Sequence, residues 1–180
     1  MLSKKMEEAL VKQINKEMHS AYIYMSMSAE SAAMGLKGFA SWFMSQYHEE
    51  MFHAMKLYEY VQSQGGKIAL TAVEEPPCGF KSALDMFEQT LAHEQHMTSN
   101  INELLELAIE ARDHATQITL HWYVTEQVEE EDTVNDIVAR LKLIGDDANA
   151  LLTIDKDLGA RTTTVPTNFS TSVTSQAKAV

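Results

Sequence analysis

The sequence predicts an all-α protein built as a bundle of four long helices. Ala, Leu, Met, Glu and Gln, which favour helices, dominate the 180 residues, and only three prolines occur. Four segments carry apolar residues at alternating steps of three and four, the spacing of a helix face, and no useful strand-like alternation appears. We expect one domain over residues 1–160 and a polar tail over 161–180, whose Thr and Ser content is typical of disorder.

The first two predicted helices are joined by a short turn. Ser3 is a suitable N-cap for the first helix, which should run to about Met34 before Gly35 ends it. The second should begin near Gly38 and end at the glycine pair 65–66. Because about four residues join them, the two helices should be antiparallel neighbours.

The third and fourth helices are predicted to form a second tight pair. The third should start after Ser82 and run to about Asp113, and the fourth should end at Gly145. The connection before this pair, residues 64–81, is too long for a local turn and could span the length of a bundle at ~3.3 Å per residue. Residues 146–158 carry one apolar side and predict a short fifth helix.

The second helix has polar residues where its inward face should be apolar. Its seam includes Phe39, Phe43, Gln46, Glu50 and His53, so that a carboxylate and an imidazole lie one turn apart. A buried ionised carboxylate costs several kcal/mol unless a partner neutralises it. In a helix bundle, Glu-x-x-His is a motif of carboxylate-bridged di-metal centres.

The other three helices are interrupted in the same way. Each apolar seam contains a polar group close to the middle of its helix; these groups are Glu17, Glu94, and the pair Gln127 and Glu130. Antiparallel helices of equal length place their midpoints at one height. The interruptions of all four helices should therefore converge on one metal site.

Charge and composition exclude several classes of function. The 14 basic and 26 acidic residues give a net charge of −12 at pH 7, which argues against a nucleic-acid partner and suits attraction of cations. Cys78 is the only cysteine, so no intrachain disulfide can form. The N-terminus lacks an apolar signal core, and no segment approaches ~18 apolar residues. We expect a cytoplasmic protein with no membrane partner.

These motifs resemble those of the bacterial non-haem ferritins, members of the ferritin-like di-iron family, over residues 1–159. The matching positions are Glu17, Tyr24, the run Glu49-Glu50-x-x-His53, Glu94 and the run Glu126-Gln127-x-Glu129-Glu130. The resemblance implies a ferritin-like bundle with one long crossover between the second and third helices and a short fifth helix. It also implies a homo-oligomeric cage of 24 subunits that oxidises Fe(II) with O₂ or peroxide and stores the ferric mineral.

The resemblance also implies a role for each matching residue. Glu17, Glu50 and His53 would form a first iron site, and Glu94 and Glu130 a second, with Glu50 bridging the two ions. Beside this ferroxidase centre, Gln127 would be a hydrogen-bonding or weak ligand and Tyr24 a possible electron source. A third, inner iron site would be built by the remaining acidic positions Glu49, Glu126 and Glu129.

Haem is not expected, because Phe52 stands where the related bacterioferritins carry a haem-ligating methionine. The residues themselves leave other chemistry open. Oxygen ligands with one imidazole suit manganese or zinc as well as iron. A di-iron enzyme acting on an organic substrate, or a structural assembly whose buried polar groups set helix register, would use similar seams.

Overall fold

The computed structural model describes residues 2–162 and 165. Over these residues the chain forms five α-helices and no strand, so the predicted fold class is confirmed. The contacts group the chain into two compact units, one containing residues up to Gly79 and from Leu152 onward, the other Phe80–Leu151. The division into a domain at 1–160 and a tail stays a prediction, since most of 161–180 lies outside the described residues.

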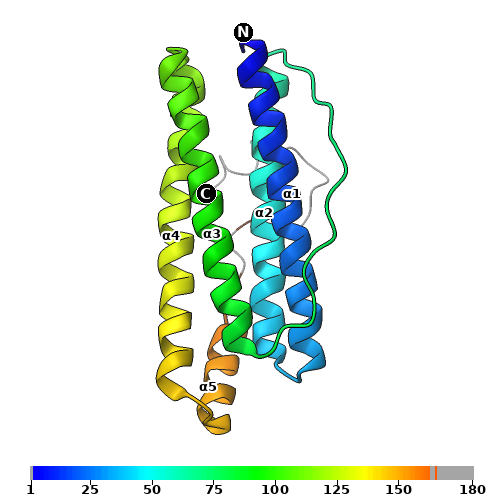
Figure 1. Ribbon diagram of the computed structural model, residues 1–180, viewed down its shortest axis with the longest axis vertical. Helices are drawn as coiled ribbons and strands as arrows, with labels where there is room; N and C mark the ends of the chain where they lie inside the picture. The colour runs from blue at the N-terminus through cyan, green and yellow to red at the C-terminus, as the bar shows by residue number, and fades with distance from the viewer. Residues whose placement is uncertain (1, 163–164, 166–180) are drawn as a thin grey trace. The chain divides into compact units, whose positions relative to one another are not determined.

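The first unit is built on an antiparallel hairpin of α1 (Lys4–Ala33) and α2 (Lys37–Ser63), seen in Figure 1. The predicted N-cap is confirmed, because the Ser3 hydroxyl accepts a hydrogen bond of 3.2 Å from the backbone amide of Met6. Gly35 has a φ of 83°, a conformation that glycine adopts without strain, and it turns the chain between the two helices.

The long connection between α2 and the second unit runs back along α1 (Figure 1). Three sets of hydrogen bonds of 2.9–3.0 Å attach it at successive heights. In order along both segments they join Lys67 to Glu7, Thr71 to Asn15, and Pro77 to Ser26. The connection is therefore a crossover along the length of a helix, as its sequence length predicts.

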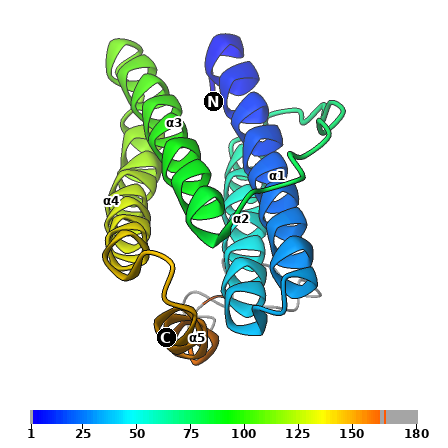
Figure 2. The same ribbon diagram turned by 60° about the horizontal axis from the view of Figure 1, so that its bottom comes forward.

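The second unit is the antiparallel pair α3 (Ala83–Glu110) and α4 (His114–Ile144), shown side by side in Figure 2. Ser82 caps α3 through the amide of Asp85, and Asp113 caps α4. Near the other end of the pair, Lys142 and Glu88 form an ion pair of 2.8 Å. The two helices meet at the tight turn that the sequence predicts, although α3 ends three residues before Asp113.

The short helix α5 (Ala148–Gly159) closes against the start of α2. The Asp155 carboxylate accepts a 2.9 Å hydrogen bond from the amide of Phe39, at a helix start that has no side-chain cap of its own. A Cβ atom added to Gly38 would lie 1.6 Å from the backbone oxygen of Asp155, and one added to Gly159 would lie 2.9 Å from the Cα of Gly38. Two glycines therefore allow backbone to pack directly on backbone here.

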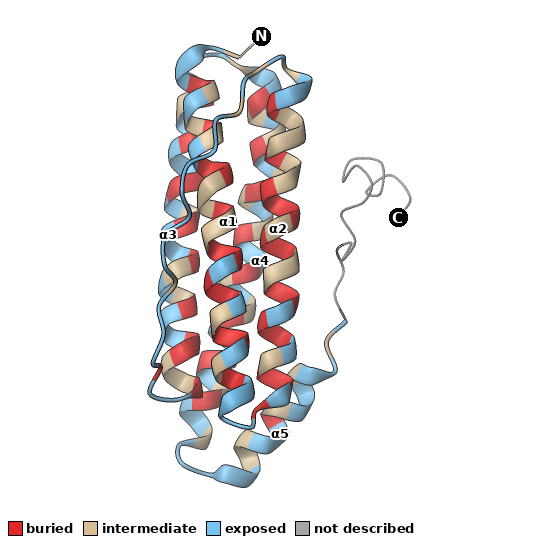
Figure 3. Cartoon of the chain, turned by 90° about the vertical axis from the view of Figure 1, so that its right-hand side faces the viewer, coloured by how far each residue is buried: buried red, intermediate tan, exposed pale blue. Residues whose placement is uncertain are grey.

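Buried residues form continuous stripes along the four long helices (Figure 3). In α1, α2 and α4 all the polar seam residues predicted from the sequence are buried; they are Glu17, Gln46, Glu50, His53, Gln127 and Glu130. On α3 the seam residue Glu94 is buried as predicted, but the buried stripe extends to one side of the seam. Thr90 and Leu104 are buried there, whereas the seam residues Leu91 and Leu105 are half-buried. No helix among the described residues is long and apolar enough to cross a membrane.

Candidate metal centre

Glu17 is buried in the middle of α1, with 2% of its surface exposed. Gln13, one turn earlier on α1, donates a hydrogen bond of 2.9 Å to Oε1 of Glu17. Burial raises the pKa of Glu17 to about 7, although hydrogen bonds with Gln13 and Glu50 and the charge of Lys16 act in the opposite direction. At neutral pH the Glu17 carboxyl group is therefore close to half-protonated.

Glu50 and His53 face the same way from adjacent turns of α2. Both are buried, and Nδ1 of His53 lies 3.8 Å from Oε2 of Glu50. Burial lowers the pKa of His53 to about 3, with a smaller contribution from the charge of Lys56. The imidazole is therefore neutral at pH 7, the form in which its nitrogen binds a metal ion.

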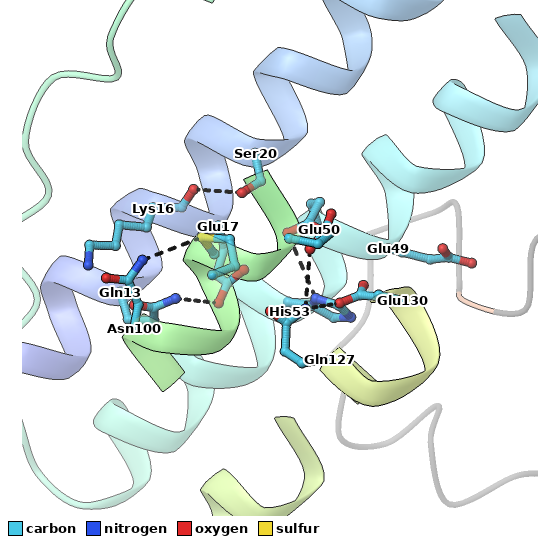
Figure 4. A network of polar contacts seen from close by, with 12 residues as sticks. Gln13, Lys16, Glu17, Ser20, Glu49, Glu50, His53, Asn100, Gln127 and Glu130 are labelled. Carbon is cyan, nitrogen blue, oxygen red and sulfur yellow. Dashed lines mark hydrogen bonds and ion pairs between the residues drawn. The ribbon is translucent and has the colours of Figure 1, made fainter. Parts of the chain in front are cut away.

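Glu17, Glu50 and His53 bring two oxygen ligands and one nitrogen ligand together. One ligand atom from each residue lies within 4.8 Å of the others, and all three side chains are buried. Figure 4 shows the side chains of α1 and α2 at this point, with the Gln13–Glu17 hydrogen bond beside them. The three residues therefore lie together in the first unit, as the sequence predicts.

The second unit holds its own polar cluster between α3 and α4. The Nε2 atom of Gln127 donates to Oε2 of Glu94 at 3.2 Å and to Oε2 of Glu130, which is on the next turn of α4. All three side chains are buried. Among the described residues, no atom hydrogen-bonds to the buried Oε1 of Gln127. One amide therefore draws two carboxylates together, as a cation between them would.

Tyr24 lies on the same face of α1 as Glu17, two turns further along the helix. It is fully buried, and its ring stacks on Phe43 of α2, with the ring centres 6.2 Å apart and the planes 20° from parallel. The Tyr24 side chain therefore faces the interior of the first unit. Its role as an electron source stays a prediction.

The three residues expected to build an inner site have different surroundings. Glu49 is buried in the first unit, where it forms an ion pair of 3.0 Å with Arg161. In the second unit Glu126 is half-buried and Glu129 exposed, one turn apart on α4. Within its own unit Glu49 thus already has a cationic partner, which the sequence did not suggest.

Two residues that lie near the candidate ligands were not recognised as functional from the sequence. Gln13 lies one turn before Glu17, and this spacing could have identified it as the hydrogen-bond donor. Arg161 falls in the segment interpreted as a polar tail, and its contact with Glu49 spans 112 positions of sequence. No local pattern could have predicted that pairing.

Comparison with known proteins places these features in one family. The ferritin-like domain family matches residues 7–144. The bacterial non-heme ferritin of Staphylococcus aureus (strain USA300) is 41% identical over 162 residues, covering 90% of this chain and 98% of that protein. The corresponding ferritin of Staphylococcus haemolyticus is 40% identical over 161 residues, covering 89% of this chain and 97% of that protein.

Solved structures agree with the sequence relatives. An engineered closed form of Archaeoglobus fulgidus ferritin has a TM-score of 0.90 at 49% identity, covering 91% of this chain and all of that one. The open-pore ferritin of the same archaeon has a TM-score of 0.89, again at 49% identity, covering 90% of this chain and all of that one. The likeness confirms a ferritin-like four-helix bundle with one long crossover and a short fifth helix. The chain belongs to the ferritin family.

Proposed function

We propose that this protein stores iron and that each chain oxidises Fe(II) at a di-iron centre. The observation that carries the proposal is the buried cluster of Glu17, Glu50 and His53, whose ligand atoms lie within 4.8 Å of one another. Two acids and a neutral imidazole at the middle of a helix pair have no packing role that an apolar trio would not fill better. The names of the relatives, which are ferritins, support the same function.

The centre would be completed by the second polar cluster. In this proposal Glu17, Glu50 and His53 bind the first Fe(II), Glu94 and Glu130 bind the second, and Glu50 bridges the two. Two features support it: the sequence seams place all five residues near the helix midpoints, and the donor set of oxygens with one imidazole suits Fe(II).

Gln127 would change its role when iron arrives. Its amide now donates to the carboxylates of both Glu94 and Glu130. An Fe(II) ion would take over the attraction of these two carboxylates and release the amide. The buried Oε1 of Gln127 would then be suited to a weak contact with the ion or with its bound water.

The chemistry requires two electrons for each O₂ that is reduced to peroxide. Two Fe(II) ions supply one electron each, and two protons complete H₂O₂, so paired ions make the step possible without a further reductant. Carboxylate ligands favour the more highly charged Fe(III) electrostatically. Few and partly weak ligands allow the product to leave for storage as a ferric mineral, which separates this site from a permanent cofactor site.

Storage requires an enclosed volume, and we propose that it is provided by a homo-oligomeric cage of 24 copies. The test is anaerobic loading with Fe(II), exposure to O₂, and measurement of particle mass on the same sample. We expect rapid oxidation, retention of many irons per chain, and a particle near half a megadalton, from 24 copies of a 20.2 kDa chain. A monomer or dimer that oxidises an organic substrate and retains no iron would contradict the proposal.

Two ligand variants and two matched controls locate the chemistry. Glu50→Ala and His53→Ala should slow Fe(II) oxidation by on the order of 10- to 100-fold or more, since even indirect changes at metal sites have effects of that size. Assembly should persist, because replacing a buried polar or charged group with an apolar one need not destabilise a bundle. The controls Glu103→Ala and His96→Ala alter exposed residues of the same types on α3 and should oxidise iron at the parent rate. Equal rates in all four variants would refute the assignment.

A further inference from the structure

Arg161, two residues beyond α5, lies against one side of α2. Its Nη2 atom donates to both oxygens of Glu49, at 3.0 and 3.1 Å, and its Nη1 atom donates to Oε1 of Gln46. The guanidinium carbon lies 5.5 Å from the ring centre of Trp42, a distance typical of cation–π contacts. One arginine thus contacts three residues of the same helix.

The three contacted residues form a stripe of α2 that runs beside the Glu50–His53 face and shares Gln46 with it. Trp42, Gln46 and Glu49 follow one another at steps of four and three, and only 1%, 3% and 6% of their surfaces are exposed. Figure 4 shows Glu49 pointing away from Glu50 and His53. A carboxylate buried to this extent needs a positive partner, and Arg161 provides it.

The position of Arg161 follows from how α5 is fixed. Asp155 caps the start of α2 through the amide of Phe39, and Gly159 packs against Gly38 with no Cβ on either residue. The chain therefore leaves α5 beside the first turn of α2, and Arg161 reaches the next turns of that helix. The packing of α5 against the start of α2 therefore holds Arg161 close to Glu49.

We propose that Arg161 is a built-in competitor for metal at Glu49: the guanidinium occupies the cation position, and a metal ion reaches this carboxylate only when the arginine leaves. The inference rests on the proposed function and on the third, inner iron site that the resemblance to bacterial non-haem ferritins implies, of which Glu49 is a ligand. As a consequence, the metal sites should fill in a fixed order. The paired site fills first, and the third ion binds more weakly because it must displace an intramolecular cation.

Zinc titration of the full-length, metal-free assembled protein tests this order, because Zn(II) binds such ligands without being oxidised. In the parent we expect two tight equivalents per chain and a weaker third. In Arg161→Gln the third should bind about tenfold more tightly or better, the size expected for loss of a charge-assisted competing contact, with the first two unchanged. Lys156→Gln removes one exposed positive charge from α5 and should behave as the parent.

Trp42 provides a second readout that does not depend on iron oxidation. In a Trp122→Phe background, binding of the third zinc should change Trp42 emission as the guanidinium leaves its ring. The same change should be missing when Arg161 is also replaced by Gln. Replacing Glu49 by Gln should abolish third-ion binding and remove any effect of Arg161→Gln.

The outcomes separate this inference from the proposed function. Two tight equivalents in every variant, with a third that is equally weak in the parent and in Arg161→Gln, would overturn the competitor role and leave the di-iron assignment intact. Failure of the parent to bind even two equivalents would overturn both. A third ion whose binding leaves Trp42 emission unchanged would also refute displacement of the guanidinium.

Discussion

Burial acts on Glu17 and His53 in opposite directions but leaves both of them nearer to neutrality. It raises the pKa of Glu17 to about 7 and lowers the pKa of His53 to about 3. Both shifts have the same main cause, since a site removed from water penalises whichever form carries charge. In the absence of metal, Glu17 therefore keeps its proton to a higher pH than an ordinary carboxylic acid does.

The retained proton should be released when a metal ion binds, because carboxylate ligands must be ionised. At pH 6 Glu17 is mostly protonated, at pH 8 it is mostly ionised, and His53 is neutral at both. We expect zinc binding to release about one more proton per chain at pH 6 than at pH 8, given the pKa of Glu17. Calorimetry in buffers of different ionisation enthalpy measures this number.

Two substitutions control the proton count. Glu17→Gln should remove the difference between the two pH values, whereas Glu103→Gln, at an exposed position of α3, should retain it. The same number of protons released at pH 6 and pH 8 by the parent would show that Glu17 is not the group that carries the proton.

Individual site residues could be predicted from the sequence where a polar residue interrupts an otherwise apolar helix face. Glu17, Glu50 and His53 could be predicted as one cluster because each interrupts an apolar seam, and burial of an acid demands a reason. Glu49 lies one position off the seam, where an acid is ordinary, so its burial could not be predicted. Its partner Arg161 depends on the packing of α5, which no periodicity encodes.

The short helix α5 is held by close contacts with the start of α2. Gly38→Ala would place a methyl group 1.6 Å from the backbone oxygen of Asp155, so α5 must move away from the start of α2. We expect the amides of residues 151–159 to exchange with solvent at least about tenfold faster, since loss of a cap alone costs about 1 kcal/mol and the steric overlap adds to it. Hydrogen exchange read by mass spectrometry resolves this segment.

The matched control for α5 is Lys156→Ala, which truncates an exposed side chain of the same helix and should leave exchange unchanged. Amides of α1, α3 and α4 should be protected equally in Gly38→Ala and the parent. Uniformly faster exchange in every helix would show that the glycine supports global stability and not the docking of α5.

The boundaries of the long helices could be predicted within a few residues because capping and breaking residues are local signals. Ser3, Gly35 and Ser82 act as their residue types suggest. The crossover could be predicted from its length alone. The burial of Thr90 and Leu104 in place of Leu91 and Leu105 could not, because the residue types do not favour it and only packing decides which residues turn inward.

Over the whole molecule, the dominant electrostatic feature is the net charge of −12 per chain at pH 7. The carboxylate clusters would be neutralised by a bound cation, and a net negative charge raises the local concentration of cations and their rate of encounter. The same excess of acid repels phosphate-rich polymers. The charge of the whole chain and the ligands of the proposed centre therefore favour one substrate class, a small divalent ion.

This attraction should be visible in the salt dependence of iron uptake. Raising NaCl from ~10 to ~150 mM shortens the screening length from ~30 to ~8 Å. With Fe(II) limiting, we expect the initial oxidation rate, read by stopped-flow absorbance, to fall severalfold over this range. With Fe(II) saturating, the rate should barely change, because O₂ is neutral and the reacting ions are already bound. A salt effect of equal size under both conditions would mean that salt acts on the chemistry and not on the encounter with the acidic chain.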